Sequence, residues 1–110
     1  MKLPDADRAI VDIVRLRDYC LSSTHPIGRH KARVFAAVLG LTAADADDLR
    51  SALLDAARLL EATPGVADEY GQRYTLDLMM MGPAGQAMVR SGWIIRTGED
   101  CPRLTPCYVL

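Results

Sequence analysis

The hydrophobic pattern of the chain changes its period once, near Tyr70, and this change constrains the fold more than any other feature. Before Tyr70 apolar residues recur at the three- and four-residue spacing of helices, and after it apolar and polar residues alternate as in half-buried strands. Helices followed by strands predict an α+β domain with the helices packed on one face of an antiparallel sheet. We expect one domain over residues 1–110, with a helical part over about 1–63 and a three- to four-stranded meander over about 70–110.

The first 40 residues are predicted to hold two helices. The spacing favours a short helix over 14–21 and a second over 29–39, which ends at Gly40 and buries Phe35. Residues 3–13 fit two patterns, a helical turn capped by an aspartate or a short strand. We expect a brief extended piece that packs on the core.

The third helix is the clearest element of the sequence. Thr42 and Asp45 form a capping box at its start, and Thr63-Pro64-Gly65 stops it. The stretch 43–70 is acidic, with seven carboxylates against two arginines, so it carries five net negative charges. Its acidic residues, of which Asp45, Asp47 and Asp48 lie in the first turns, predict either a solvated face or a surface for a basic partner.

Three strands are predicted after Tyr70. The alternation indicates strands over 73–80 and 87–96, joined by a turn at 82–85, and a last strand over 103–109. Pro106 has no backbone N–H to donate, so this last strand should lie at an edge of the sheet or carry a bulge. An open edge would also allow pairing with a second copy of the chain.

Composition excludes several classes of protein. The formal net charge is −1, so the chain is not a globally basic nucleic-acid binder. No apolar run approaches the roughly 20 residues that span a bilayer, and the N-terminus lacks an apolar signal-peptide core, so we expect a cytoplasmic protein without membrane contact. With three cysteines at irregular spacing and two histidines, the sequence shows no disulfide framework and no metal-site spacing, and we expect no cofactor.

The candidate site residues are a cluster in the loop and first turn before Phe35, together with polar residues on the strands. Imidazole can accept or donate a proton near neutral pH, and cations can stabilise a phosphorane, as cleavage of RNA by its own 2′-hydroxyl requires. A tyrosine on a strand could also stack on a base. The candidates are His25, His30, Lys31, Arg73, Arg103 and Tyr108.

Each of these residues also has a structural interpretation. His25 stands before Pro26 and could hydrogen-bond a loop carbonyl, whereas His30 could be a surface residue of a first helical turn. Tyr74 and Trp93 are at strand positions where aromatic residues pack into the core. Tyr108 becomes a site residue if it faces outward beside Arg73 or Arg103.

Several short motifs together resemble a small, uncharacterised family of bacterial domains. The resemblance covers nearly the whole chain, and it implies a short stand-alone gene beside another small gene, in the manner of toxin–antitoxin pairs. The motifs are Leu-Pro-Asp-Ala-Asp-Arg-Ala near the start, His25-Pro-x-Gly-x-x-Lys-Ala-x-x-Phe35, Tyr70-Gly-x-x-Tyr74, Gly82-Pro-x-Gly85, Trp93-Ile, and Pro102-Arg-Leu-Thr-x-x-Tyr108.

The predicted order of elements also resembles, more distantly, the barnase–EndoU–colicin–RelE superfamily of small ribonucleases. That resemblance implies a helical contribution from His25, His30 and Lys31, and a sheet contribution from Arg73, Arg103, Thr105 and Tyr108. The chain departs from the pattern because no histidine lies on its strands and its net charge is slightly negative.

Two functions remain open from the sequence. The first is a metal-independent endoribonuclease toxin that a small cognate antitoxin or immunity protein holds inactive. The second is a non-catalytic binding module, such as an antitoxin, immunity protein or phage-borne inhibitor, that acts through its acidic helix face. The position of the histidines relative to the polar face of the sheet separates the two.

Overall fold

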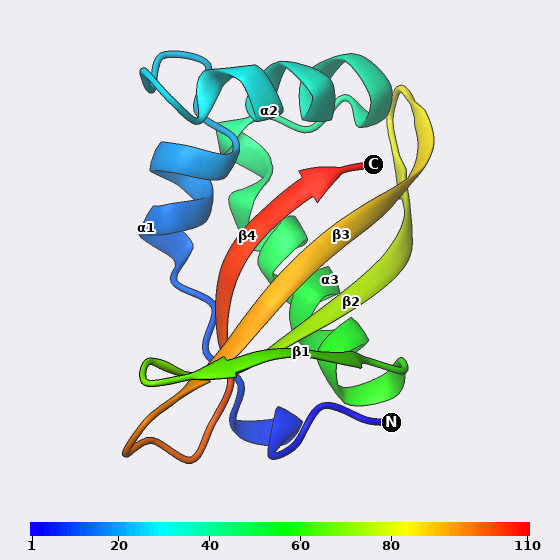
Figure 1. The fold of residues 1–110 in the computed structure, drawn as a ribbon. Coiled ribbons are helices and arrows are strands. Elements are labelled where there is room, and N and C mark those ends of the chain that lie inside the picture. Colours follow the sequence, from blue (N-terminus) through cyan, green and yellow to red (C-terminus); the bar gives the residue numbers. More distant parts are fainter.

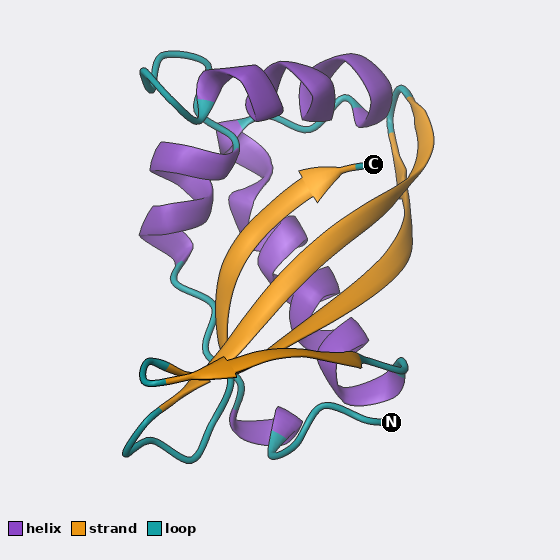
Figure 2. Cartoon of the chain, in the orientation of Figure 1, coloured by secondary structure: helices purple, strands orange, loops and turns teal.

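The computed structural model describes all 110 residues and shows an α+β fold. Four antiparallel strands form one sheet in the order β1-β2-β3-β4, and the helices pack behind it and across one end (Figures 1 and 2). The predicted fold class is therefore confirmed. The strands are β1 (Thr63–Asp68), β2 (Gly71–Gly82), β3 (Gly85–Arg96) and β4 (Arg103–Val109).

The three predicted helices are present. The first two both continue into a π-helical segment, and the third begins with a 3-10 turn. The second ends at Gly40, whose φ of +73° is left-handed, and the Thr42–Asp45 capping box starts the third. None of the helices is long and apolar enough to cross a bilayer. Their bounds are α1 (Ile13–Arg15) with Leu16–Cys20, α2 (Arg29–Val34) with Phe35–Leu39, and Ala43–Asp45 leading into α3 (Ala46–Leu59).

A single hydrophobic core fills the space between the helices and the sheet. β2 and β3 alternate between buried and more exposed residues, so Leu76, Val89 and Trp93 point into the core. Phe35 and Leu49 reach the same core from α2 and α3 with no exposed surface. The predictions that Phe35, Tyr74 and Trp93 are core residues are confirmed.

The N-terminal residues pack on the core without adding a strand to the sheet. A 3-10 turn occupies Ala6–Arg8, and isolated bridges join Lys2 to Glu61 and Ile10 to Arg103. Leu3 and Val11 are buried. The predicted extended piece is thus limited to two isolated bridges, with a helical turn between them. The segment therefore combines the two patterns that the sequence left open.

The fourth strand of the sheet is β1, which the sequence analysis did not predict, because it treated Thr63-Pro64-Gly65 only as the stop after the third helix. All six of its residues are exposed, so they show no alternation that would predict a strand. Its pairing with β2 covers only Gly71–Thr75, with an irregularity between Pro64 and Ala67. The rest of the β2 edge therefore has no neighbouring strand.

The two-residue turn Pro83-Ala84 fixes the register of the β2–β3 hairpin, because it places Gly82 opposite Gly85. β4 lies at the other edge of the sheet, and its pairing with β3 shifts register opposite Gly92, where Pro106 packs. The prediction that Pro106 marks an edge strand or a bulge is confirmed on both counts.

Candidate active site on the outer face of the sheet

A row of three polar side chains crosses the face of the sheet that points away from α3. Asp77 on β2 is opposite Arg90 on β3, and Arg90 is opposite Tyr108 on β4. Directly opposed residues in antiparallel strands project to the same side of a sheet, so the three side chains share one face. The row begins five residues from the hairpin turn.

Arg90 and Asp77 form a two-pronged ion pair at the centre of this row. Arg90 Nε and Nη2 donate to Asp77 Oδ1 and Oδ2, both at 2.9 Å. The hydrogen bonds from Arg90 lower the pKa of Asp77 below its ordinary value, and those to Asp77 raise the pKa of Arg90. Tyr108 adds a smaller contribution in the same direction to Arg90, as expected for a phenol oxygen close to the guanidinium.

Lys31 reaches this row from α2. Its Nζ lies 4.6 Å from the centroid of the Tyr108 ring, which is within the range of a cation–π interaction. Figure 1 shows α2 lying across the end of the sheet at which β4 ends. Two of the six predicted site residues, separated by most of the chain, are therefore in contact.

The position of α2 is fixed at both of its ends. At the start, Gly28 passes so close to the Tyr19 backbone that an added Cβ would lie 2.2 Å from its carbonyl oxygen. At the far end, Ala84 N–H in the hairpin turn donates to the Leu39 carbonyl at 3.2 Å. Because α2 is held by a helix and by the hairpin, Lys31 is placed over Tyr108 by the backbone.

His25 holds the loop that leads into α2. Its Nδ1 accepts hydrogen bonds from the backbone N–H groups of Ile27 and Gly28, both at 3.0 Å. Its ring contacts Tyr19 edge-on, with 4.6 Å between centroids. An Nδ1 that accepts two bonds leaves Nε2 as the protonated nitrogen of a neutral ring. His25 thus bonds within its own loop, but it accepts from two backbone N–H groups, whereas the structural interpretation expected a bond to a carbonyl.

His30 is exposed in the first turn of α2, and its ring takes part in no hydrogen bond or ion pair. It directly precedes Lys31 and keeps both ring nitrogens available to solvent or ligand.

Arg73 and Arg103 lie on the same face as Tyr108 but further along the strands. Both flank Ile94, which is four residues from Arg90 on β3, a separation of about 13 Å at strand spacing. Arg103 is held by Glu99 through bonds of 3.2 and 3.0 Å, and this contact lowers the pKa of Glu99. The structure therefore separates these two arginines from the Lys31–Tyr108 contact.

Arg90 and Asp77 were missed as site residues. The sequence analysis placed both on strands but did not use the register that the hairpin turn implies. Counting back from Gly82 and Gly85 sets Asp77 opposite Arg90, so the pair could have been found from the turn. Its link to Tyr108 could not, because it depends on the bulge at Pro106.

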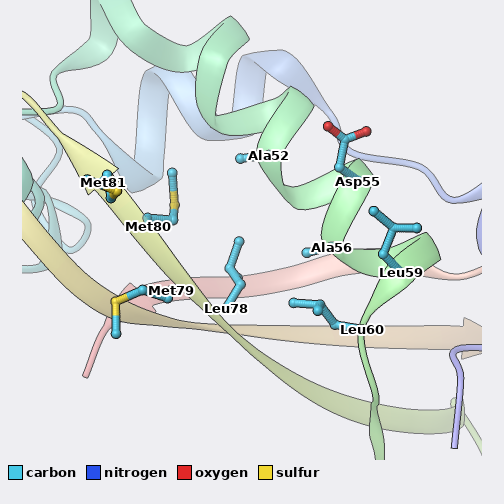
Figure 3. A pocket seen from close by; sticks show the side chains of 9 residues that line it. All are labelled: Ala52, Asp55, Ala56, Leu59, Leu60, Leu78, Met79, Met80 and Met81. Atoms are coloured by element: carbon cyan, nitrogen blue, oxygen red, sulfur yellow. The ribbon is translucent and has the colours of Figure 1, made fainter.

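The outer face is an open surface. None of the three cavities in the chain is lined by any of the six predicted site residues. The largest, about 330 Å³, lies instead between α3 and β2 (Figure 3). No group of three or more histidine, cysteine or carboxylate side chains is arranged to hold a metal ion.

These elements define an α+β protein whose four-stranded meander presents a Lys–Tyr–Arg–Asp row beside the end of a helix. The chain belongs to the family described as a domain of unknown function, DUF6883, whose profile matches residues 2–110.

One similar solved structure is a chain of a contact-dependent growth inhibition toxin–immunity protein complex from Klebsiella pneumoniae 342. The two share 16% of their residues over 94% of this chain and 95% of that chain, with a TM-score of 0.54. At that identity the similarity shows a common fold. No curated protein matches the chain.

Proposed function

We propose that this chain is the toxin of a toxin–antitoxin or toxin–immunity pair and acts as a metal-independent endoribonuclease. The observation that carries the proposal is the contact between Lys31 and Tyr108, in which a helix N-terminus and the last strand bring a cation and a phenol together. The similarity to a chain of a toxin–immunity complex supports a place in such a pair, and the distant resemblance to small ribonucleases supports the toxin role within it.

The row and the first turn of α2 together have the groups that cleavage by a 2′-hydroxyl needs. In that reaction a bond forms between the 2′-oxygen and phosphorus, and the bond from phosphorus to the 5′-oxygen breaks. His30 is the candidate to accept the proton of the 2′-hydroxyl, and Tyr108 to donate a proton to the leaving 5′-oxygen. Lys31 and Arg90, which both lie beside Tyr108, are the candidates to stabilise the negative charge of the phosphorane.

His25 enters this proposal as a positioning residue. Its two bonds to the backbone shape the loop from which α2 starts, so they set the place of His30 and Lys31. Arg73 and Arg103 lie about 13 Å from the reacting groups along the strands, a distance suited to contacts with neighbouring phosphates of a bound RNA strand.

The test is expression in a bacterial host, with growth and RNA integrity as readouts. We expect the wild-type chain to slow growth and degrade RNA, and His30→Ala, Lys31→Ala and Tyr108→Phe each to suppress both effects. Arg29→Ala is the matched control, because it removes a cation from the same helix two residues from Lys31, where side chains point to different sides. A wild-type chain that is harmless and leaves RNA intact would refute the proposal.

A second candidate function rests on the acidic helix. Asp47 and Asp48, in the first turn of α3, are exposed and form no ion pair. Such a surface suits an antitoxin, an immunity protein or a phage-borne inhibitor that covers a basic partner. In the expression test this function predicts a harmless wild-type chain, with partner neutralisation lost in the Asp47→Lys/Asp48→Lys variant.

A further inference from the structure

Half of the outer edge of β2 is unpaired. β1 covers β2 only as far as Thr75, and no backbone hydrogen bond outside the β2–β3 ladder involves residues 77–81. Gly82 and Gly85 close the hairpin as a hydrogen-bonded pair, and such pairs alternate along an antiparallel ladder. The backbone N–H and C=O groups of Asp77, Met79 and Met81 therefore point away from β3, to an edge without a strand.

The groove between α3 and β2 runs beside this edge. Its volume is about 330 Å³, and eight of its nine lining residues are hydrophobic. Leu78 points from β2 toward α3, whereas Met79 points to the opposite side (Figure 3). Leu59 and Met81 are 66% and 81% exposed, so these two apolar side chains of the groove lie outside the core. Edge and groove together offer backbone partners for a strand and an apolar site for its alternate side chains.

The uncompensated charge on the face of α3 beside the groove is negative. Asp48, Ala52, Asp55 and Leu59 follow one another at helical spacing, so they share the face of α3 that borders the groove. Asp55 is paired with Arg58, whereas Asp48 forms no ion pair. No basic residue lines the groove.

The other edge of the sheet, formed by β4, is less accessible to an added strand. Ile10 N–H donates to the Pro102 carbonyl at 2.8 Å, and Leu104 N–H donates to the Ile10 carbonyl at 3.0 Å. Pro106 has no N–H to offer a neighbouring strand. A strand that adds to this sheet along several residues has only the β2 edge.

We propose that residues 77–81 of β2, with the adjoining face of α3, form a β-augmentation site for a partner polypeptide. The occupant is an extended segment in which apolar residues alternate with lysine or arginine. Its apolar side chains fill the groove, and its backbone pairs with Asp77, Met79 and Met81. This inference goes beyond RNA cleavage and does not depend on it. A strand bound there lies three strand spacings from β4, about 14 Å from Tyr108.

The probe is a fluorescein-labelled ten-residue peptide of alternating valine and lysine, with a valine–glutamate peptide of the same length as the charge control. We expect saturable binding of the first peptide by fluorescence anisotropy and at least about tenfold weaker binding of the second. In ¹⁵N-resolved spectra of the chain, the amide signals of Asp77, Met79 and Met81 should shift on binding.

Met79→Pro is the decisive variant. Met79 N–H points away from β3, so proline at this position removes a donor for the partner without removing a bond of the hairpin. We expect about tenfold weaker peptide binding, whereas Met79→Val, which keeps the N–H, should bind as the wild type does. Circular dichroism and thermal unfolding are the controls that test whether both variants are folded. Asp48→Asn should weaken binding and reduce its salt dependence.

Three results would overturn the proposal. The first is a wild-type chain that does not bind the valine–lysine peptide up to about millimolar concentration, where a specific contact would be detected. The second is binding that Met79→Pro leaves unchanged. The third is a wild-type chain that sediments as a dimer and becomes monomeric in Met79→Pro, since a second copy would then occupy the edge.

Discussion

Ser91 and Trp93 form a buried relay whose loss has a calculable effect on stability. Trp93 Nε1 donates to Ser91 Oγ at 3.0 Å, and Ser91 Oγ donates to the Leu76 carbonyl at 2.8 Å. Ser91 is 0% exposed and Trp93 is 1% exposed, so water cannot replace either bond. Ser91→Ala therefore leaves the indole N–H buried without an acceptor.

The cost of Ser91→Ala is dominated by that N–H. An unsatisfied buried donor costs about 1–3 kcal/mol, and the Leu76 carbonyl is protected because it lies in a hydrogen-bonded pair with β3. We expect a loss of about 2 kcal/mol in the free energy of unfolding. With a urea dependence of about 1.5 kcal/mol per molar, the midpoint of urea unfolding should fall by about 1.3 M.

A double-mutant cycle with Trp93→Phe checks the cause. Phenylalanine at this position has no N–H that could be left without an acceptor, so Ser91→Ala should cost about 1–2 kcal/mol less in that background. A midpoint that moves by less than about 0.3 M in Ser91→Ala, or a cost that is the same with and without the indole, would refute the reasoning.

Three further changes probe other parts of the chain. The pKa of Asp77 is lowered in the fold, so its pair with Arg90 contributes its full stability above about pH 4, and this contribution is lost as the pH falls further, through the lowered pKa. Asp77→Asn should cost about 0.5–1 kcal/mol at pH 7 and less as the pH is lowered from about 4 to about 2, measured by urea unfolding; an equal cost at pH 7 and at the lowest pH would contradict this. Gly28→Ala puts a Cβ 2.2 Å from the Tyr19 carbonyl oxygen, so the start of α2 must move. Thermal unfolding should show that the free energy of unfolding falls by about 1–3 kcal/mol, whereas an unchanged melting temperature would contradict this. Burial raises the pKa of the Cys20 and Cys107 thiols, whereas Cys101 is only half-buried, so a disulfide reagent at pH 8 should label Cys101 first and label all three thiols only after unfolding. Rapid labelling of all three thiols in the native protein would contradict that burial.

The helices and the hairpin were predictable because their signals are local. The capping box at Thr42, the left-handed Gly40 and the two-residue turn at Pro83-Ala84 each fix a boundary within a few residues of sequence. β1 carries no such signal. Its six residues are all exposed and include Pro64 and Gly65, and only its backbone pairing with β2 makes it a strand.

The candidate site was predictable as a set of residue types more than as an arrangement. Lys31 and Tyr108 were both among the candidates, but their contact was not predicted. The sequence analysis considered Arg73 or Arg103 as the neighbour of Tyr108, whereas the structure places Arg90 opposite it. The difference comes from tertiary geometry. The direction of α2 and the register shift in β4 decide which basic residue stands next to the phenol, and neither follows from local pattern.

The ion pairs on the outer face decide where a phosphate can bind. Arg90 and Arg103 are each held by a carboxylate in a two-pronged contact, so a phosphate must compete with Asp77 or Glu99 for them. Lys31 has no carboxylate partner, and its ammonium group lies over an aromatic ring. A phosphate attracts an ammonium group more strongly than an aromatic face does, so it can bind Lys31 without displacing a carboxylate. If the proposed function holds, we therefore expect an RNA phosphate on this face to bind at Lys31, and we expect Asp77, at the other end of the row, to disfavour a further phosphate at Arg90.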